Sequence, residues 1–190
     1  KNFGGTDICL IPWICDDNYE HSIQEIENSN AQIALGHLEI KGFEMHSGHM
    51  NMQGLDKSMF RRYEKVISGH FHKKSDDGQI YYLGSQYEIT WSDYKCPKGF
   101  HIFDTETREL TRVPNPIRIH KKLIYNDKEN DYTNKDLSSF KDTFVKVFVK
   151  NKTNEEMFNN LIDRLHNTVD THEVNIIEDL NTDITASVKE

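Results

Sequence analysis

Three histidines follow short apolar segments of this chain, where their side chains could act together. His37 comes after an apolar segment at residues 33–36, and His70 and His72 come after a second one at residues 65–69. A glycine precedes both His37 and His70, and glycine lets the backbone turn sharply where a strand ends. Side chains at positions i and i+2 of a strand share a face, so His70 and His72 can point the same way if the strand conformation continues past Gly69. Three imidazoles at one edge of a sheet predict a metal site.

Other interpretations of these histidines remain open at this point. A single histidine at a strand end is more often a hydrogen-bonded core or surface residue than a metal ligand. A three-histidine zinc site of the carbonic anhydrase kind and a cupin site are alternative metal geometries. The cupin pattern requires a glutamate shortly after its His-x-His, whereas Lys73, Lys74 and Ser75 follow here. The two Gly-His steps together favour a metal site.

The elements that would position the histidines alternate between strand and helix. Strand, helix, strand is the unit of a parallel or mixed layered sheet. Apolar periodicity and turn residues predict strands at residues 6–12, 32–36, 64–69 and 80–83, and the last of these is expected to return after a tight turn. Helices are predicted at residues 21–28 and 56–63, and a hairpin is predicted that pairs residues 100–103 with 110–113. Short paired strands next to this sheet favour a two-sheet sandwich with flanking helices.

A second, smaller module is expected after Pro114 and Pro116. The pattern predicts a strand at residues 117–125, a polar linker at 126–135, a strand at 144–149, an amphipathic helix at 154–167 and a return strand at 174–177. Thr153 and Glu156 have the spacing of a capping box at the start of that helix.

Several motifs follow one another in a fixed order along residues 1–120. Leu10-Ile11-Pro12-Trp13-Ile14-Cys15 precedes Gly36-His37-Leu38-Glu39, which is followed by Ser68-Gly69-His70-Phe71-His72, Tyr82-Leu83-Gly84-Ser85 and Lys98-Gly99-Phe100-His101-Ile102-Phe103-Asp104-Thr105-Glu106-Thr107. This order resembles the second half of the calcineurin-like metallophosphoesterases. Within that family the sequence is most similar to the nuclease subunits of the SbcD type and their phage counterparts, and it matches them only in outline beyond residue 120.

The resemblance implies a set of metal ligands. His37 and His70 would bind one ion and His72 a second, with Mn²⁺ as the preferred ion and Mg²⁺ as an alternative. Paired ions of this kind activate a water for in-line attack on a phosphodiester. Glu39 would not be a ligand; it would accept a hydrogen bond from His37 and orient that imidazole.

The family's first three motifs, Asp-x-His, Gly-Asp-x-x-Asp and Gly-Asn-His-Asp, do not precede His37 in this sequence. They contain the bridging aspartate, an asparagine ligand and the histidine that protonates the leaving group. We therefore expect Lys1 to be an internal residue of a longer polypeptide, the metal site to be incomplete in this chain, and its catalytic residue to be unknown from this sequence.

Further residues are candidates for substrate contacts. His46 and His49 lie in a glycine-containing loop at residues 42–54, which we expect to cover the metal site, although exposed loop residues are the plainer interpretation. In the resembled family the loop that begins with Ser85 lines the nucleotide side of the site. Tyr87 and Trp91 in this loop could stack on a base, although packing beneath the loop is the commoner use of such rings.

Composition describes a globular protein of a reducing compartment. Hydrophobic residues make up 36% of the chain, and its three cysteines have no Cys-x-x-Cys spacing, so we expect no disulfide framework and a cytoplasmic location. No apolar run approaches the roughly 20 residues of a membrane span. The net charge of −8 disfavours DNA binding, but bound cations and basic clusters at residues 61–62, 73–74 and 118–122 could offset it locally.

Taken together, the sequence predicts an α/β (α+β) chain with three parts. Residues 1–122 would be the C-terminal half of a metallophosphoesterase domain, residues 123–178 a small α/β capping domain that holds DNA, and residues 179–190 a polar tail. The expected function is that of a metal-dependent DNA exonuclease and endonuclease component of a repair or recombination complex, inactive as a fragment. By resemblance its partners would be DNA, an SbcC-type coiled-coil ABC ATPase and a second copy in a homodimer. A small-substrate phosphoesterase of the same fold and a noncatalytic scaffold fragment are the alternatives.

Overall fold

The computed structural model describes residues 1–46 and 48–178, apart from the side chain of His46; the predicted tail at residues 179–190 lies outside this part. The chain divides into two compact units. The first unit comprises residues 1–87 and 96–116, and the second comprises, among the described residues, 88–95 and 117–178. The segment 88–95 thus leaves the first unit to pack with the second. The functional domain limits inferred from the sequence stay a prediction.

The first unit is built on a six-stranded sheet with the order β1-β2-β3-β6-β8-β7. The four strands at its centre, β2, β3, β6 and β8, are parallel, because a crossover connection separates each of them from the next. The central strands are β2 (Thr6–Leu10), β3 (Ile33–Gly36), β6 (Lys65–Ser68) and β8 (Ile80–Tyr82), and the antiparallel edges are β1 (Asn2–Phe3) and β7 (Ser75–Asp76). The carboxyl ends of β3 and β6 therefore meet at the same edge of the sheet.

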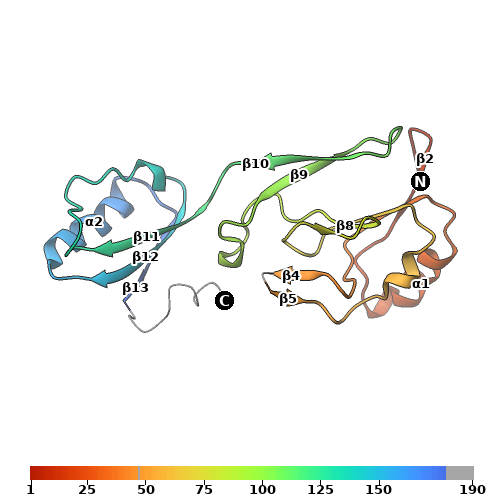
Figure 1. Ribbon diagram of the computed structural model, residues 1–190, viewed down its shortest axis with the longest axis horizontal. Helices are drawn as coiled ribbons and strands as arrows, with labels where there is room; N and C mark the ends of the chain where they lie inside the picture. Colours follow the sequence, from red (N-terminus) through yellow and green to blue (C-terminus); the bar gives the residue numbers. More distant parts are fainter. Residues whose placement is uncertain (47, 179–190) are drawn as a thin grey trace. The chain divides into compact units, whose positions relative to one another are not determined.

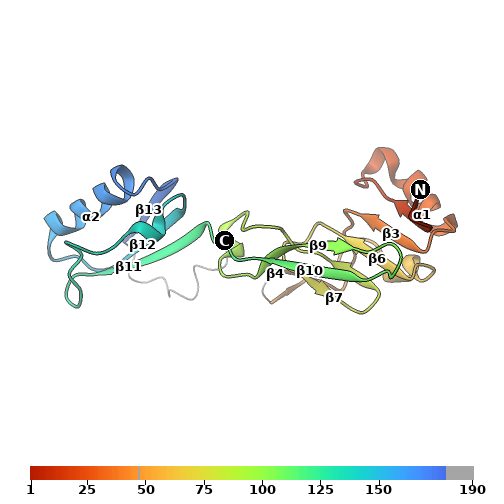
Figure 2. The same cartoon turned by 90° about the horizontal axis from the view of Figure 1, so that it is seen from above.

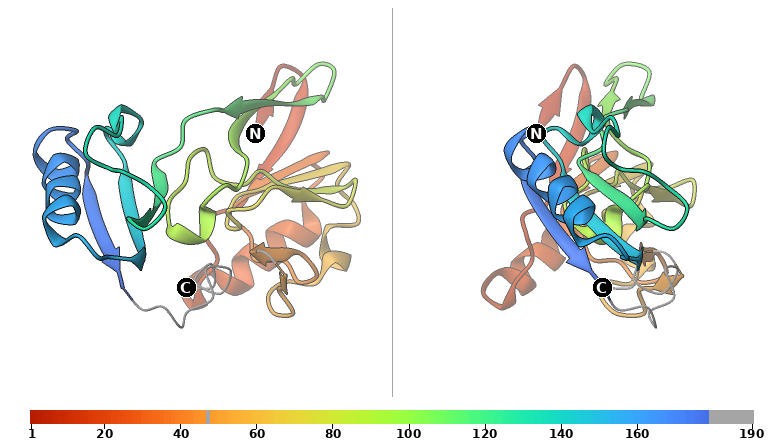
Figure 3. Two further views of the ribbon diagram at one scale, coloured as in Figure 1. Left: turned by 60° about the vertical axis from the view of Figure 1, so that its left-hand side comes forward. Right: turned by 90° about the vertical axis from the view of Figure 1, so that its left-hand side faces the viewer.

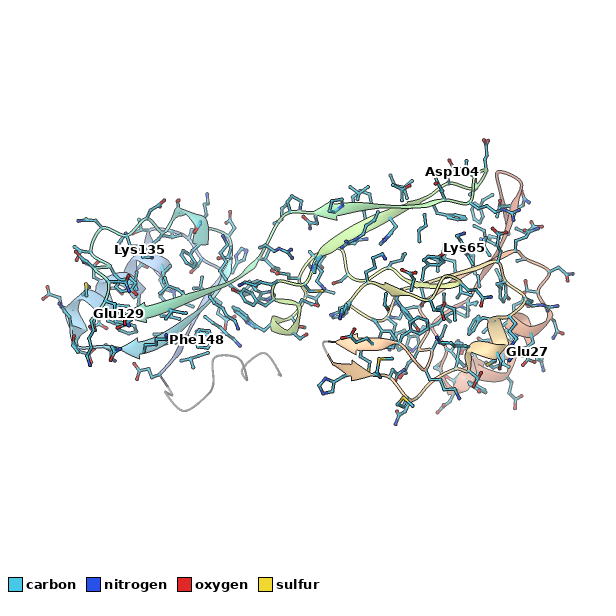
Figure 4. All side chains as sticks on the ribbon, in the orientation of Figure 1. Glu27, Lys65, Asp104, Glu129, Lys135 and Phe148 are labelled. Carbon is cyan, nitrogen blue, oxygen red and sulfur yellow. The ribbon has the colours of Figure 1, made fainter. Side chains whose placement is uncertain are left out.

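Both faces of this sheet are covered. One face packs against α1 (Tyr19–Asn28) and the turn at Lys57–Phe60, with Ile26, Val66 and Phe60 fully buried between them. The other face packs Ile8, Ile33 and Ile67 against the hairpin of β9 (Lys98–Phe103) and β10 (Leu110–Asn115). Figure 1 shows the hairpin and α1 on opposite sides of the sheet, Figure 2 shows the hairpin crossing in front of the sheet, and Figure 4 shows the side chains that fill the layers. A second, small hairpin pairs β4 (Glu44–His46) with β5 (His49–Met50).

The second unit is a three-stranded parallel sheet with one helix. Its strands are β11 (His120–Asn126), β12 (Phe144–Asn151) and β13 (Glu173–Ile177), in that order in the sheet. Helix α2 (Glu155–Asn167) crosses over between β12 and β13 and lies along the sheet, as Figure 3 shows. Its residues Phe158, Leu161 and Leu165 are buried against one face of that sheet. Alternate residues of β11 and β12 thus face α2, while His120 and Lys122 lie on the other face.

The structure confirms the mixed α/β fold class and corrects three details. Strand β8 runs parallel to β6, because the chain after β6 first forms β7 and then turns antiparallel into β8. The predicted helix at residues 56–63 is a single turn of 3₁₀ helix at Lys57–Phe60. Asn154 rather than Thr153 caps α2, because its side-chain oxygen accepts a hydrogen bond from the backbone N–H of Met157 at 2.9 Å. Among the described residues, no helix is long and apolar enough to cross a bilayer.

Candidate metal centre

His37 and His70 meet at the carboxyl edge of the parallel sheet. β3 ends at Gly36 and is hydrogen-bonded to β6, which ends at Ser68, so the two loops that follow leave the sheet side by side. The imidazole centroids of His37 and His70 are 5.3 Å apart, with the rings nearly perpendicular. Gly69 makes this approach feasible, because a Cβ at that position would lie only 2.8 Å from Nδ1 of His37.

The backbone at His70 differs from the expected strand. The strand ends at Ser68, and His70 has a φ of +84°, in the left-handed region that residues other than glycine rarely adopt. The strand conformation therefore does not continue past Gly69, and the condition for His70 and His72 to share a strand face is not met. Uncommon backbone conformations of this kind concentrate at functional sites, where the surrounding structure maintains them.

His72 is close enough to act electrostatically on His37. Burial lowers the pKa of His37, and repulsion by the imidazoles of His70 and His72 lowers it further. A lowered pKa keeps this imidazole neutral near neutral pH, which is the form that binds metal. The backbone carbonyl of His72 is fixed by hydrogen bonds from Nζ of the buried Lys98, at 2.9 Å, and from the backbone N–H of Ser85, at 3.1 Å.

Two buried side chains fix the backbone that carries His37 and Glu39. The hydroxyl of Ser68 accepts a hydrogen bond from the N–H of Leu38 at 2.9 Å. The hydroxyl of Tyr82 donates to the carbonyl of Leu38 and accepts from the N–H of Ile40, both at 2.9 Å. Burial raises the pKa of Tyr82, so its hydroxyl stays protonated and can donate. Sequence reasoning missed both roles; the only available signal was the position of Ser68 and Tyr82 at the ends of neighbouring strands.

Glu39 is half-buried and lies beside a close backbone contact. Its carbonyl accepts a hydrogen bond from the N–H of Leu55 at 2.8 Å, and Gly54, with a φ of +87°, has no room for a Cβ next to that carbonyl. Within residues 1–46 and 48–178, no hydrogen bond joins the Glu39 carboxylate to His37. The role of Glu39 in orienting His37 stays a prediction.

A cavity of about 510 Å³ opens next to the two imidazoles. Its lining includes His37, His70, Glu39 and Trp13. The indole of Trp13 is 5.0 Å from the His37 ring and 5.8 Å from the His70 ring, measured between centroids. Trp13 was not among the site residues expected from the sequence, although it lies directly after Pro12, where β2 has ended.

The donor set fits part of a metal centre. In the described part of the chain, no group of three or more His, Cys, Asp or Glu side chains is arranged to hold an ion. His37 and His70 supply imidazole nitrogens, whereas hard cations such as Mn²⁺ and Mg²⁺ prefer oxygen ligands. These residues therefore fit the nitrogen side of such a centre and leave its oxygen ligands to be supplied from elsewhere.

The candidate substrate contacts lie in different places. Ser85 is next to His72, with its hydroxyl donating to the carbonyl of Tyr87 at 2.9 Å, and Tyr87 is 53% exposed in the first unit. Trp91 belongs to the second unit, where its ring packs 4.6 Å from that of His120. His49 is exposed opposite His46 in the β4–β5 hairpin, and the side chain of His46 lies outside the described part.

Comparison with known proteins adds direct evidence on ancestry. The chain is 36% identical to exonuclease subunit 1 of Enterobacteria phage T4 over 124 residues, which are 65% of this chain and 36% of the phage protein. It is 24% and 28% identical to the SbcD component of the nuclease SbcCD from Staphylococcus saprophyticus and from Staphylococcus epidermidis, over 112 and 110 residues respectively. Over these residues the chain is a relative of the SbcD-type nuclease subunits.

The match covers a limited part of each protein. The two staphylococcal alignments include 55% and 52% of this chain and 29% of each relative, so the chain spans about a third of the length of the curated relatives it matches. No family model matches the sequence. The resemblance inferred from the Gly-His-x-Glu and Gly-His-x-His motifs is confirmed, and the likeness favours a metallophosphoesterase fold for the first unit.

Proposed function

We propose that this chain is part of a metal-dependent DNA nuclease subunit, with exonuclease and endonuclease activity, that acts in DNA repair or recombination. The relatives named above are an exonuclease component and two nuclease components, which supports hydrolysis of phosphodiester bonds. The observation that carries the proposal is the pairing of His37 and His70, 5.3 Å apart at the carboxyl edge of a parallel sheet. In open α/β sheets this edge is where ligands bind.

The proposed cofactor is a pair of Mn²⁺ ions, with Mg²⁺ as the alternative. His37 and His70 would hold one ion and His72 the second. When bound, such ions activate a water and neutralise the charge of the phosphodiester. This chain contributes a neutral His37, a turn that brings His70 against it, and the hydrogen bonds of Ser68 and Tyr82 that fix the intervening backbone.

The second unit provides a surface for the DNA backbone. Nζ of Lys146 lies 4.5 Å from the ring centroid of Trp91, and Nζ of Lys122 lies 4.7 Å from that of Tyr94. Burial lowers the pKa of Lys122, and the positive charges of Lys146 and Lys95 lower it further. Among the described residues, no carboxylate forms an ion pair with these three lysines, so a phosphate would relieve their repulsion. This lysine cluster supports the proposal that the second unit is a capping domain that holds DNA.

The quaternary proposals rest on the names of the relatives. The phage relative is named as one subunit of an exonuclease, and the staphylococcal relatives are each named as one component of the nuclease SbcCD. We propose that the intact protein works with an SbcC-type coiled-coil ABC ATPase and forms a homodimer. The cytoplasmic location predicted from the cysteines stays a prediction.

The chain by itself is proposed to bind Mn²⁺ weakly and to hydrolyse nothing. Its imidazoles supply nitrogen ligands, and the described residues add no carboxylate cluster to satisfy a hard cation. The same observation favours a second candidate function, a noncatalytic module that binds DNA without cleaving it. A small-substrate phosphoesterase has less support, because the relatives are nucleases and the second unit presents a lysine cluster.

Metal binding by the chain tests the first candidate. The electron paramagnetic resonance signal of free Mn²⁺ should decrease on addition of the wild-type chain. His37→Ala or His70→Ala should lower the affinity for Mn²⁺ about tenfold or more. His166→Ala is the matched control, because His166 is exposed on α2 in the second unit. Equal binding by all the variants would refute the assignment of the centre. A nuclease assay of the intact parent protein, with and without His72→Ala, separates the nuclease from the noncatalytic module.

A further inference from the structure

Two exposed aromatic side chains lie at the rim of the cavity beside His37 and His70. Trp13 is 59% exposed and Tyr19 is 50% exposed, and both line the same cavity of about 510 Å³. Cavities of roughly 300 to 1,000 Å³ are typical of sites for small organic ligands. Large aromatic rings carry much apolar surface, so their exposure at a cavity next to a proposed metal centre indicates a binding role.

The backbone around Trp13 is held in place before any ligand arrives. The side-chain amide of Asn18 donates a hydrogen bond to the carbonyl of Trp13 at 2.8 Å, and its side-chain oxygen accepts from the N–H of Cys15 at 2.9 Å. The imidazole rings of His37 and His70 lie close to the indole, with their centroids 5.0 Å and 5.8 Å from its centroid. Because these hydrogen bonds fix the loop, binding to the indole costs little conformational entropy, and the ring can act as a rigid stacking surface.

The charges around the cavity indicate which part of a nucleotide would enter it. Lys41 is paired with Asp56 at 2.8 Å, which leaves the carboxylates of Asp16 and Glu39 to set a negative potential at the lining. Negative potential repels a phosphate. Leu38 and Leu55 contribute apolar surface, which suits an uncharged ring. The cavity therefore complements a base, while the phosphate attached to that base would be directed toward the histidines.

We propose that Trp13 forms a nucleobase-stacking site that holds one base of the DNA substrate, with the adjoining phosphodiester at His37 and His70. Tyr19 lies on the same rim and flanks the base. The inference rests on the proposed function, because it takes DNA as the ligand. It goes beyond that function by naming a residue that contacts a base and not the DNA backbone. Every DNA base has a π-face that can stack on an indole.

Fluorescence offers a direct test, because the chain has only two tryptophans, Trp13 and Trp91. In a Trp91→Phe background, Trp13 is the sole indole, and all comparisons are made in this background so that the second unit is held constant. The probes are a short single-stranded oligonucleotide and the same oligonucleotide with abasic sites at its ends. Both are titrated in the presence of a chelator, so that the result does not depend on metal binding.

We expect the normal oligonucleotide to quench and shift the Trp13 emission and the abasic one to leave it nearly unchanged. Anisotropy of a labelled oligonucleotide should show about tenfold weaker binding for Trp13→Ala and a smaller loss for Trp13→Phe, which keeps an aromatic face. His37→Ala should retain the quenching even though it weakens Mn²⁺ binding. Circular dichroism establishes that each variant is folded.

The outcomes separate this inference from the proposed function. Binding of both oligonucleotides with equal affinity, or binding without any change in Trp13 emission, would overturn the base site and leave the nuclease proposal standing. Absence of Mn²⁺ binding by the wild-type chain, with the quenching of Trp13 intact, would do the reverse. Failure of the chain to bind either oligonucleotide would overturn both.

Discussion

Replacing Tyr82 by phenylalanine should destabilise the first unit and loosen the loop that carries His37. The hydroxyl of Tyr82 is fully buried and joins two backbone groups, the carbonyl of Leu38 and the N–H of Ile40, each at 2.9 Å. Phenylalanine has the same ring and fills the same space, so the change removes the hydroxyl and little else. The N–H of Ile40 would then be buried without an acceptor.

The expected cost follows from the two hydrogen bonds. Each contributes a net of about 1 kcal/mol to stability, and a buried N–H left without a partner adds a desolvation penalty of about 1 kcal/mol or more, so the free energy of unfolding should fall by about 2 to 3 kcal/mol. Tyr81 provides a matched control in the same strand. Its hydroxyl donates to the carbonyl of Gly78 at a solvent-accessible position, so Tyr81→Phe should cost less than about 0.5 kcal/mol.

Two measurements check this prediction. Urea unfolding followed by circular dichroism gives the stability difference between the two variants. Hydrogen exchange of the Ile40 amide gives the local effect, and its protection should fall by about 30-fold or more in Tyr82→Phe, since a factor of ten corresponds to about 1.4 kcal/mol. Mn²⁺ affinity should fall with it, because His37 loses its fixed backbone. Equal stability of the two variants, or an unchanged Ile40 amide, would refute the reasoning.

Three further predictions follow from other contacts. Gly69→Ala should weaken Mn²⁺ binding about tenfold or more with little loss of stability, because the new Cβ displaces the exposed imidazole of His37; calorimetric titration of Mn²⁺ checks it. Glu88→Gln should cost the second unit about 1 to 3 kcal/mol, whereas the exposed Glu129→Gln should cost less than about 0.5 kcal/mol, as measured by urea unfolding; Figure 4 labels Glu129. Burial lowers the pKa of His120 in the folded state, so below a pH of about 6.5 the unfolded state binds more protons than the folded state does. The free energy of unfolding should therefore fall as the pH drops through that value. His120→Gln should flatten this dependence of stability on pH.

The reason for the Glu88 effect lies in its buried carboxylate. It accepts hydrogen bonds from the N–H groups of Ile119 at 3.0 Å and His120 at 2.9 Å, and from that of Lys95 at 3.2 Å. Glutamine has only one acceptor oxygen. If that oxygen is turned toward the N–H groups of Ile119 and His120, the NH₂ group faces the N–H of Lys95, which is left without an acceptor. An unchanged free energy of unfolding in Glu88→Gln would mean that the carboxylate does not anchor the segment 88–95. Retained Mn²⁺ affinity in Gly69→Ala, or an unchanged pH profile in His120→Gln, would contradict the other two predictions.

The sequence predicted much of the first unit because its signals are local. Apolar runs ending in glycine gave strands β3 and β6 within one residue or two, and the glycines indicated where the chain turns to deliver His37 and His70. The order of these motifs was also sufficient to indicate the relationship to SbcD-type nucleases, which the comparisons confirm. Composition and periodicity likewise predicted α2 between β12 and β13.

Other features depend on contacts between residues far apart in the sequence, and these the pattern did not predict. The direction of β8 was wrong because a turn-rich segment fits both a hairpin and a longer return through β7. The burial of Glu88 depends on the backbone N–H groups of Ile119 and His120, 31 and 32 residues away, so no local pattern indicated it. For the same reason the pattern did not indicate that Trp91, Tyr94 and the segment around them pack in the second compact unit.

The sequence by itself determined the residue types at the strand ends and therefore the kind of chemistry available, since imidazoles after glycines are encoded locally. Only the tertiary structure decided that the rings of His37 and His70 come within 5.3 Å, that His70 adopts a left-handed backbone, and that the ring of Trp13 lies within 6 Å of both. The physical reason is that adjacency in a parallel sheet is set by crossovers and by packing on both faces. Those contacts join residues such as Leu38 and Tyr82, 44 positions apart, which no short window of sequence contains.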